Sequence, residues 1–289
     1  MTDTLLAPAT PAHDAFVEDL LAWREKRVAS LTDPYGWWSI TSLNWLEEGL
    51  NLVGSGAGVA VRLASRFPAL AATLVVSGDS LTITPAPGAA LSLDGAPLTG
   101  PLTVHADQAF MVEGDTPVRV AIVRRGDLWG VRVYDPEAAR GRNAATDVAW
   151  FEPQPGWVVD AELLAADPGE TVPVSNVIGQ VSMQPVAGRV RFQHGGATHT
   201  LLATHAGGGR LFINFRDVSN EDLDRPSQDP VSYSGGRFLI TDAPTDGRVA
   251  LDFNRAYHPP CAHTPYATCP MPTRGNELPF RVTAGERVP

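Results

Sequence analysis

The chain has 289 residues, of which 44% are hydrophobic and 19% are charged. That apolar content is sufficient for a core and excludes a disordered chain. The 27 glycines and 25 prolines exclude a helical bundle or a coiled coil, and they favour many short strands joined by turns. They follow no three-residue period, which excludes collagen.

The charge balance restricts the partners of the protein. Acidic residues outnumber basic ones by 32 to 22, which gives a formal net charge of −10. An acidic chain without a basic stripe repels phosphate backbones, so we expect no nucleic-acid partner. The single lysine, Lys26, is predicted on an exposed helix face, which argues against Schiff-base chemistry.

Targeting signals are not evident in the sequence. The first basic residue is Arg24, whereas a secretion signal needs an early positive region followed by an apolar run. No apolar run reaches the ~18 residues of a membrane-spanning helix. We therefore expect a cytoplasmic protein without a membrane partner, in which Cys261 and Cys269 are reduced thiols.

The N-terminal segment is predicted to be a tail followed by a helix. Residues 1–10 are loose and rich in Ala, Thr and Pro, which is typical of a disordered tail. Thr10 and Pro11 suit a helix start, because a hydroxyl caps the helix and proline fits its first position. Apolar residues at helical spacing predict a helix from about 11 to 32, within a segment 11–33.

Residues 34–145 are predicted to form an antiparallel β-sandwich. The segment opens with an aromatic run that contains Trp37, Trp38 and Trp45. Such a run suits a hydrophobic plug against a sheet or, alternatively, the wall of a ligand pocket. Short apolar or alternating runs follow, separated by turns such as Asp94–Gly95.

Residues 146–289 are predicted to form a second antiparallel β unit. Residues 190–201 suit a hairpin that turns at Gly195–Gly196, which places His194 and His199 on one face. Such a pair can bind metal or transfer protons, but it is more often packed and hydrogen-bonded.

Two further predictions concern the same unit. Residues 237–241 and 248–253 are predicted to pair as a hairpin around Asp246–Gly247. The acidic segment Asp217–Asp224 is predicted to be a solvated loop, with an irregular cation site as the alternative. It is not an EF-hand, because its sixth position is Asp222 where glycine is required.

The C-terminal block has the densest set of polar and reactive residues. On the strand 248–254, Val249, Leu251 and Phe253 are predicted to share one face, with Asp252 and Asn254 on the other. A loop rich in proline follows, and a rigid loop after a strand can hold side chains in fixed geometry. The loop 252–270 carries Tyr257, Cys261, Tyr266 and Cys269.

The two cysteines leave three interpretations open. With two histidines they give a set of zinc-type ligands at a spacing that matches no standard site: His258, Cys261, His263 and Cys269. Alternatively, Cys261 is a nucleophile activated by a neighbouring His258 or Arg255. The third interpretation is that both cysteines are small buried packing residues.

A set of motifs extends along the chain from about residue 14 to its end: Trp23, Arg24, Arg27, Gly36–Ile40, Trp45, Leu46, Glu48, Gly49, Asn51, Gly54, Ser55, Val148–Pro153, Gly236–Leu239, Leu251–Tyr257, Pro259–Ala262, Pro265–Pro270 and Ala284–Glu286. Through these residues the chain resembles the bacterial and archaeal domain-of-unknown-function 1684 family. The resemblance implies relatives but no activity. The family usually has Asn in place of His258 and an aromatic residue in place of His263, which weakens the zinc interpretation.

The first half also resembles a degenerate forkhead-associated β-sandwich, through Asn51–Ser55, Val61–Arg66 and Leu93–Gly95. Such domains bind phosphothreonine with an arginine after the glycine, and here that position is Ser55. Asp94 replaces the usual asparagine and brings negative charge to the phosphate position. The resemblance therefore implies the fold, and we do not expect a phosphopeptide partner.

We predict a mostly-β protein with an N-terminal helix, a forkhead-associated-like sandwich and a second antiparallel unit. The function predicted first is a hydrolase-type enzyme for a small polar or anionic substrate, without a cofactor. Asp252 would be the base, Arg237 the anion anchor, and Tyr257 or Cys261 would transfer a proton or attack. The alternative is a non-catalytic binding module in which the same residues are structural. Further binding residues in either case are Asn254, Tyr266, Cys269, Glu286, Trp37 and Trp45.

Overall fold

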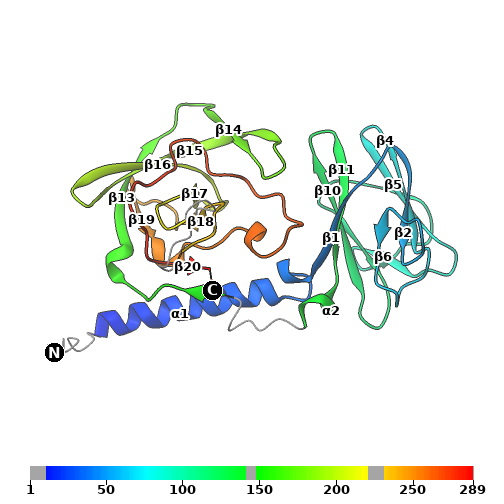
Figure 1. The fold of residues 1–289 in the computed structure, drawn as a ribbon. Coiled ribbons are helices and arrows are strands. Elements are labelled where there is room, and N and C mark those ends of the chain that lie inside the picture. The colour runs from blue at the N-terminus through cyan, green and yellow to red at the C-terminus, as the bar shows by residue number, and fades with distance from the viewer. Residues whose placement is uncertain (1–10, 141–147, 221–230, 289) are drawn as a thin grey trace. The chain divides into compact units, whose positions relative to one another are not determined.

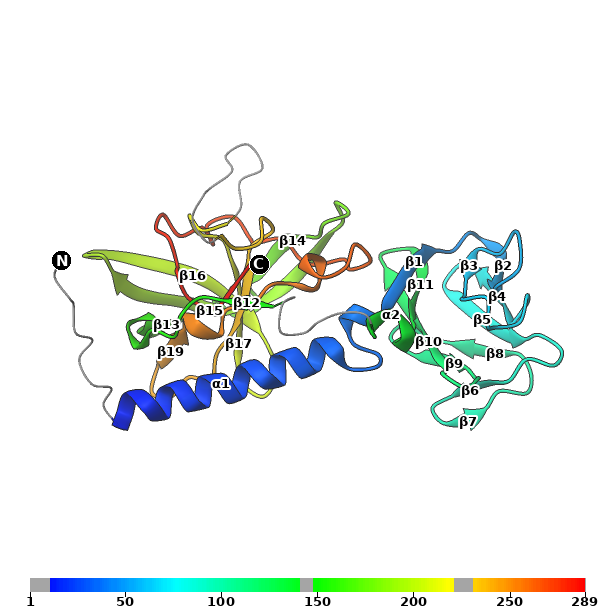
Figure 2. The same ribbon diagram turned by 60° about the horizontal axis from the view of Figure 1, so that its bottom comes forward.

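The computed structural model of the chain describes residues 11–140, 148–220 and 231–288, so the predicted tail 1–10 lies outside the described residues. The described residues divide into two compact units. The first unit is drawn from Met1–Ala29, Asn143–Ala262 and Thr268–Pro289, and the second from Ser30–Arg142 and His263–Ala267. Figures 1 and 2 show the elements of both units.

The helix α1 (Pro11–Thr32) has the predicted bounds. It ends two residues before Pro34, whose ring cannot continue a helix. Leu20 and Leu31 are completely buried, whereas Lys26 is exposed as predicted. No helix in the described part of the chain is long and apolar enough to cross a membrane.

The second unit is a sandwich of two sheets. One sheet has the strand order β1-β11-β10-β9-β6-β7 and the other the order β3-β2-β4-β5-β8. Its elements are η1 (Trp37–Ser39), β1 (Ile40–Trp45), β2 (Gly49–Gly54), β3 (Val61–Arg62), β4 (Ala72–Ser77), β5 (Ser80–Pro85), β6 (Leu91–Leu93), β7 (Ala96–Pro97), β8 (Leu102–Val104), β9 (Ala109–Val112), β10 (Val118–Arg125), β11 (Leu128–Tyr134) and α2 (Pro136–Ala139).

The core between these two sheets follows from the alternation of their strands. In β4 every second residue is buried, and Leu74 packs in the same cluster as Ile122 and Val131 of the facing sheet. The predicted turns are present, since Asp94 and Gly95 have positive φ values of 51° and 78° between β6 and β7. A right-handed strand twist favours such turns.

The first unit is built on a seven-stranded sheet with the order β18-β17-β16-β15-β13-β19, in which β14 also pairs with β15. Its elements are β12 (Ala149–Trp150), η2 (Pro155–Trp157), β13 (Val158–Ala165), β14 (Thr171–Ser175), β15 (Val181–His194), β16 (Ala197–His205), β17 (Leu211–Phe215), β18 (Arg237–Ile240), β19 (Arg248–Asp252), η3 (Phe253–Arg255), η4 (Pro260–Ala262) and β20 (Glu286–Arg287). The helix α1 runs along one side of this unit in both views (Figures 1 and 2).

The hairpin predicted between 237–241 and 248–253 does not form. The turn at Asp246–Gly247 is present, but β18 pairs with β17 and β19 pairs with β13. The two strands therefore lie at opposite edges of the sheet. The prediction was wrong because a turn sequence determines only that the chain reverses direction. It does not determine which strand the next segment pairs with.

The two edges of the curved sheet are connected through a residue that follows β19. The amides and carbonyls of Phe238 and Tyr257 form two backbone hydrogen bonds, of 2.8 and 2.9 Å. Inside the curve lies an apolar cluster that includes Phe192, Phe215 and Phe253. This closure brings the C-terminal block against β18, which positions the polar residues described below.

The predicted hairpin around Gly195–Gly196 is confirmed, and Phe192 pairs with His199 across it. His194 stacks on Phe280 with 4.2 Å between ring centroids, and His199 meets the same ring edge-on at 4.8 Å. The His199 Nε2 atom lies 3.2 Å from the His194 carbonyl oxygen. Both rings are thus packed, and the His199 ring is also hydrogen-bonded, which favours the structural interpretation of this pair.

Candidate functional site

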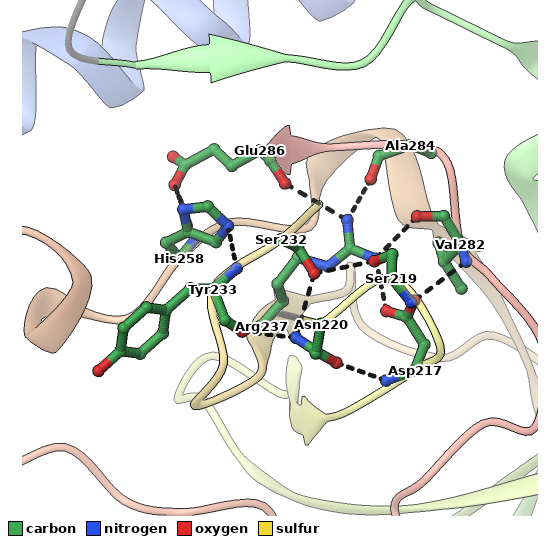
Figure 3. Close-up of polar contacts among 10 residues, drawn as sticks. All are labelled: Asp217, Ser219, Asn220, Ser232, Tyr233, Arg237, His258, Val282, Ala284 and Glu286. Atoms are coloured by element: carbon green, nitrogen blue, oxygen red, sulfur yellow. Dashed lines mark hydrogen bonds and ion pairs between the residues drawn. The ribbon is translucent and has the colours of Figure 1, made fainter. Parts of the chain in front are cut away.

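A buried polar network surrounds Arg237, the first residue of β18 (Figure 3). Its side chain is completely buried, and its Nη2 atom lies 2.6 Å from the Asp217 Oδ2 atom. The guanidinium also donates to the carbonyls of Val282 at 2.9 Å and Ala284 at 2.5 Å. A buried arginine needs such partners because water cannot solvate its charge. Arg237 is therefore a bracing residue that ties β18 to the C-terminal segment.

The segment that provides Asp217 is folded into the same network. Asp217 Oδ1 accepts hydrogen bonds from the amides of Ser219 at 2.7 Å and Val282 at 3.1 Å. Asn220 accepts from the Asp217 amide at 2.6 Å, and its own amide group donates to the Tyr233 carbonyl at 2.6 Å. The prediction of a solvated loop is wrong for Asp217, Ser219 and Asn220, which are buried because Arg237 needs a buried anion, whereas Val218 is exposed. Residues 221–224 lie outside the described residues.

A second group of contacts joins helix α1 to this network. Glu286, which is 1% exposed, accepts from Arg27 Nε at 2.7 Å and from the His258 amide at 2.6 Å. Arg27 also donates to the His258 carbonyl at 2.9 Å. The Tyr233 amide donates to His258 Nε2 at 3.0 Å, so that ring nitrogen is the acceptor (Figure 3). These contacts fix His258 and Glu286 in structural positions.

Asp252 and Asn254 stabilise the short helix η3 that follows β19. Asp252 Oδ1 accepts from the Asn254 amide at 3.0 Å, and Oδ2 accepts from Arg255 Nε at 3.0 Å. Asn254 is completely buried and exchanges two 2.9 Å hydrogen bonds with the backbone of Gln154. The prediction that Asn254 shares an outer strand face with Asp252 is therefore wrong. The Asp252 cap ends the strand, and the chain turns into a helical geometry.

Tyr257 lies between the sheet and helix α1. Its ring is 4.7 Å from the Arg27 guanidinium carbon and 6.4 Å from the Trp23 ring centroid. Burial raises the pKa of the Tyr257 phenol, which the positive charge of Arg27 only partly offsets. The phenol therefore stays protonated at neutral pH, where it cannot serve as an anionic base or nucleophile.

Replacing Tyr257 with Phe is expected to reduce the alkaline loss of stability. A raised pKa means that the folded state keeps the phenol proton after the unfolded state, with a pKa near 10.0, has released it. The contribution of Tyr257 to stability is thus intact below pH 10 and declines as pH rises further. Denaturant midpoints measured from pH 8 to 11 should fall less steeply in Tyr257→Phe. Tyr35 and Tyr233 remain in both proteins, so an identical pH dependence of the two denaturant midpoints would contradict a raised pKa of Tyr257.

The remaining predicted residues are divided between the units. Trp37, Trp45 and Tyr266 belong to the second unit, where the Tyr266 carbonyl accepts from Arg132 Nε at 3.0 Å. Trp37 is partly buried against Ile40. These three residues pack within that unit, which favours the structural interpretation of the aromatic run.

Cys261 and Cys269 lie next to each other in the first unit. The Cys261 amide donates to the Cys269 sulfur at 3.1 Å, and the Cys269 amide donates to the Cys261 sulfur at 3.3 Å. Burial raises the pKa of the nearby Tyr233 phenol, and the charges of the two cysteines raise it further. Cys261 is half-buried and Cys269 is buried.

The arrangement of residues 11–140, 148–220 and 231–288 does not support the zinc interpretation. Within these ranges, no group of three or more His, Cys, Asp or Glu side chains lies close enough to hold an ion. His258 bonds to the Tyr233 amide, and His263 lies 6.2 Å from the Trp38 ring. His258, Cys261, His263 and Cys269 thus do not form a metal-ligand group.

An open cavity of about 450 Å³ lies on the outer face of β13, β15 and β19. Glu162 pairs in register with both Arg191 of β15 and Arg248 of β19. Arg191 Nη2 lies 2.6 Å from Glu162 Oε2, and Arg248 Nε lies 3.0 Å from an oxygen of Asp160. The sequence analysis overlooked these residues, although the outward positions of a strand follow from its period of two. They form the most solvent-accessible group of charges described in this subsection.

Comparison with known proteins gives relatives without an assigned activity. No curated protein matches the chain. A solution NMR structure of an uncharacterised protein from Haloarcula marismortui is 28% identical to it, with a TM-score of 0.39. The likeness covers 49% of this chain and 76% of that one. Residues 144–287 match the model of the family described as "Protein of unknown function (DUF1684)", which confirms the predicted resemblance for that half of the chain.

Proposed function

We propose that residues 148–288 form a non-catalytic binding module for a small molecule that carries both a positive and a negative group. The observation that carries this proposal is the charge arrangement of the open cavity on β13, β15 and β19. Two arginines and two carboxylates line the cavity in neighbouring pairs, so their formal charges cancel. A ligand with both signs of charge and no net charge matches that arrangement.

The hydrolase-type alternative fits the contacts less well. It assigns the general base to Asp252 and the anion anchor to Arg237. A general base must lie within hydrogen-bond reach of its substrate, but both oxygens of Asp252 already accept hydrogen bonds within η3. Arg237 is completely buried and engaged by Asp217. These contacts support bracing roles for both residues.

The cavity is large enough for a small molecule, and the ion pairs that line it are weak enough for a ligand to replace them. A volume of about 450 Å³ is within the range that holds small molecules. Arg191 and Glu162 are 47% and 45% exposed, and pairs of this kind contribute little to stability. A ligand carboxylate can therefore replace Glu162 at the Arg191 guanidinium, where a two-pronged contact is favoured. A ligand ammonium group can bind Asp160 in the same way.

Thermal unfolding with and without free glutamine tests the proposal. We expect glutamine to raise the melting temperature of the wild-type protein, because a ligand that binds only the folded state stabilises it. At a concentration one hundred times the dissociation constant, the gain is about 2.7 kcal/mol. The double variant Arg191→Gln/Arg248→Gln should lose this gain. Lys26→Gln, which removes a positive charge from an exposed position outside the cavity, should keep it.

A third variant separates the binding module from the hydrolase-type alternative. Asp252→Ala should melt at a lower temperature, since loss of a helix cap costs about 0.5–2 kcal/mol, yet it should keep the full glutamine-dependent gain. The proposal fails if wild-type protein shows no gain. It also fails if Asp252→Ala loses the gain while the double arginine variant keeps it, which would place the site in the loop 252–270.

A further inference from the structure

We propose that Cys261 and Cys269 form a reversible thiol–disulfide site that exchanges with low-molecular-weight disulfides. Each cysteine amide donates to the sulfur of the other cysteine, at 3.1 and 3.3 Å. This reciprocal contact is more specific than the packing of two small apolar residues. It goes beyond the binding module proposed above and uses none of the residues of the cavity on β13, β15 and β19.

The reciprocal contact brings the two residues to the geometry that a disulfide needs. A disulfide joins residues whose Cα atoms are about 4.4–6.8 Å apart. Each sulfur here contacts a nitrogen that is one bond from the Cα of the other cysteine. Both sulfurs thus lie between the two backbone segments. Rotation about the Cα–Cβ bonds can then bring the two sulfurs together.

The difference in exposure assigns a role to each sulfur. Cys261 is half-buried in η4, whereas Cys269 is only 5% exposed. An incoming disulfide therefore meets the Cys261 sulfur first. Each sulfur accepts one hydrogen bond from the amide of the other cysteine, so exposure alone sets the order of attack. Cys261 is the attacking thiolate, and Cys269 is the resolving thiol.

The reaction is balanced by an external disulfide as the oxidant. The Cys261 thiolate attacks one sulfur of the small disulfide, a mixed disulfide forms, and one small thiolate leaves and takes up a proton. The Cys269 thiolate then attacks the Cys261 sulfur, and the second small thiol leaves. The protein loses two protons and two electrons, while the small disulfide is reduced to two thiols.

Tyr233 is a neighbour of the two cysteines, and its backbone is held in place by hydrogen bonds. The Tyr233 phenol lies close enough to both sulfurs for their charges to affect it. The backbone of Tyr233 is held by His258 and Asn220, at 3.0 and 2.6 Å. In Figure 3 the Tyr233 ring points away from the network around Arg237.

Oxidised glutathione is a suitable probe, with intact mass and thiol alkylation as readouts. The folded full chain should lose both alkylatable thiols, and its mass should fall by two hydrogens without a glutathione adduct. Cys269→Ser should instead accumulate one glutathione on Cys261, because the resolving thiol is missing. Cys261→Ser should react at least ~10-fold more slowly, because the remaining sulfur is buried. Dithiothreitol should restore both thiols in the wild-type protein.

Three outcomes would overturn the proposal. One is a stable glutathione adduct on the wild-type chain, and another is a disulfide between two chains. The third is that both thiols react in urea but not in the folded protein, which would identify them as packing residues. Wild-type protein alone decides all three, so the proposal stays testable if a serine variant does not fold. Peptide mapping of the oxidised chain should identify the Cys261–Cys269 link.

Discussion

Asp217→Ala is expected to lower the free energy of unfolding by about 3–5 kcal/mol, because it leaves a buried guanidinium without its anion. Arg237 is completely buried, and its Nη2 atom lies 2.6 Å from the Asp217 carboxylate. The same carboxylate accepts from the amides of Ser219 and Val282. Chemical denaturation at neutral pH measures the loss, which should appear as a lower midpoint with an unchanged slope.

Two further variants make this expectation specific. Asp217→Asn keeps an acceptor at the same position but removes the charge, so it should lose less stability than Asp217→Ala. Asp160→Ala removes the carboxylate of a pair that is 55% and 67% exposed, and it should unfold close to the wild-type midpoint. Equal midpoints for Asp217→Ala and Asp160→Ala would contradict the bracing role of the buried pair.

Gly285→Ala is expected to lower the free energy of unfolding by about 2–5 kcal/mol, from backbone strain and overpacking together. Gly285 has a φ of +83°, which L-residues rarely adopt. A Cβ atom there would clash with the carbonyl oxygen of Ala256 and lie 2.9 Å from that of Phe253. The Ala256 oxygen accepts from the Glu286 amide at 2.8 Å, so the substitution would also disturb the contacts of Glu286.

Gly275→Ala provides a matched control for this substitution. Gly275 has a similar φ of +92°, but nothing lies within 4 Å of the position that its Cβ would take. It should therefore lose only the ~1–2 kcal/mol of the left-handed conformation. Thermal or chemical unfolding of both variants separates the two contributions. If Gly285→Ala is no less stable than Gly275→Ala, close backbone packing at Gly285 is not a stabilising feature.

Local features of the fold could be predicted from the sequence. Helix α1 has its predicted bounds, and the hairpin at Gly195–Gly196 forms with Phe192 opposite His199. Both predictions depend on neighbours in the chain: helical spacing that ends before a proline, and a two-glycine turn between alternating strands. Local rules of this kind act within about a dozen residues.

Pairing between distant segments could not be predicted in the same way. The segments 237–241 and 248–253 flank a turn at Asp246–Gly247, but they join opposite edges of the sheet. Strand β19 instead pairs with β13, about ninety residues earlier. The choice of partner depends on which apolar faces together enclose the core, and a turn signal does not contain that information.

The polar residues of the candidate site illustrate the same limit. Arg237, Asp252, Asn254 and Glu286 were predicted from the sequence as catalytic or binding residues. The residues that contact them were not predicted. Asp217, for example, was assigned to a solvated loop, although it is the anion beside Arg237. One signal was available, because Asn220 follows Asp217 at a spacing that suits side-chain capping of a turn.

The sequence by itself determined the mostly-β class, the N-terminal helix, the acidic charge and the position of the polar C-terminal block. Each of these depends on composition or on short-range periodicity. Only the tertiary structure decided that Arg237 and Glu286 brace the fold and that the two cysteines meet through their amides. Contacts such as that between Arg27 and Glu286 join segments that lie far apart in the chain, so local sequence patterns do not specify them.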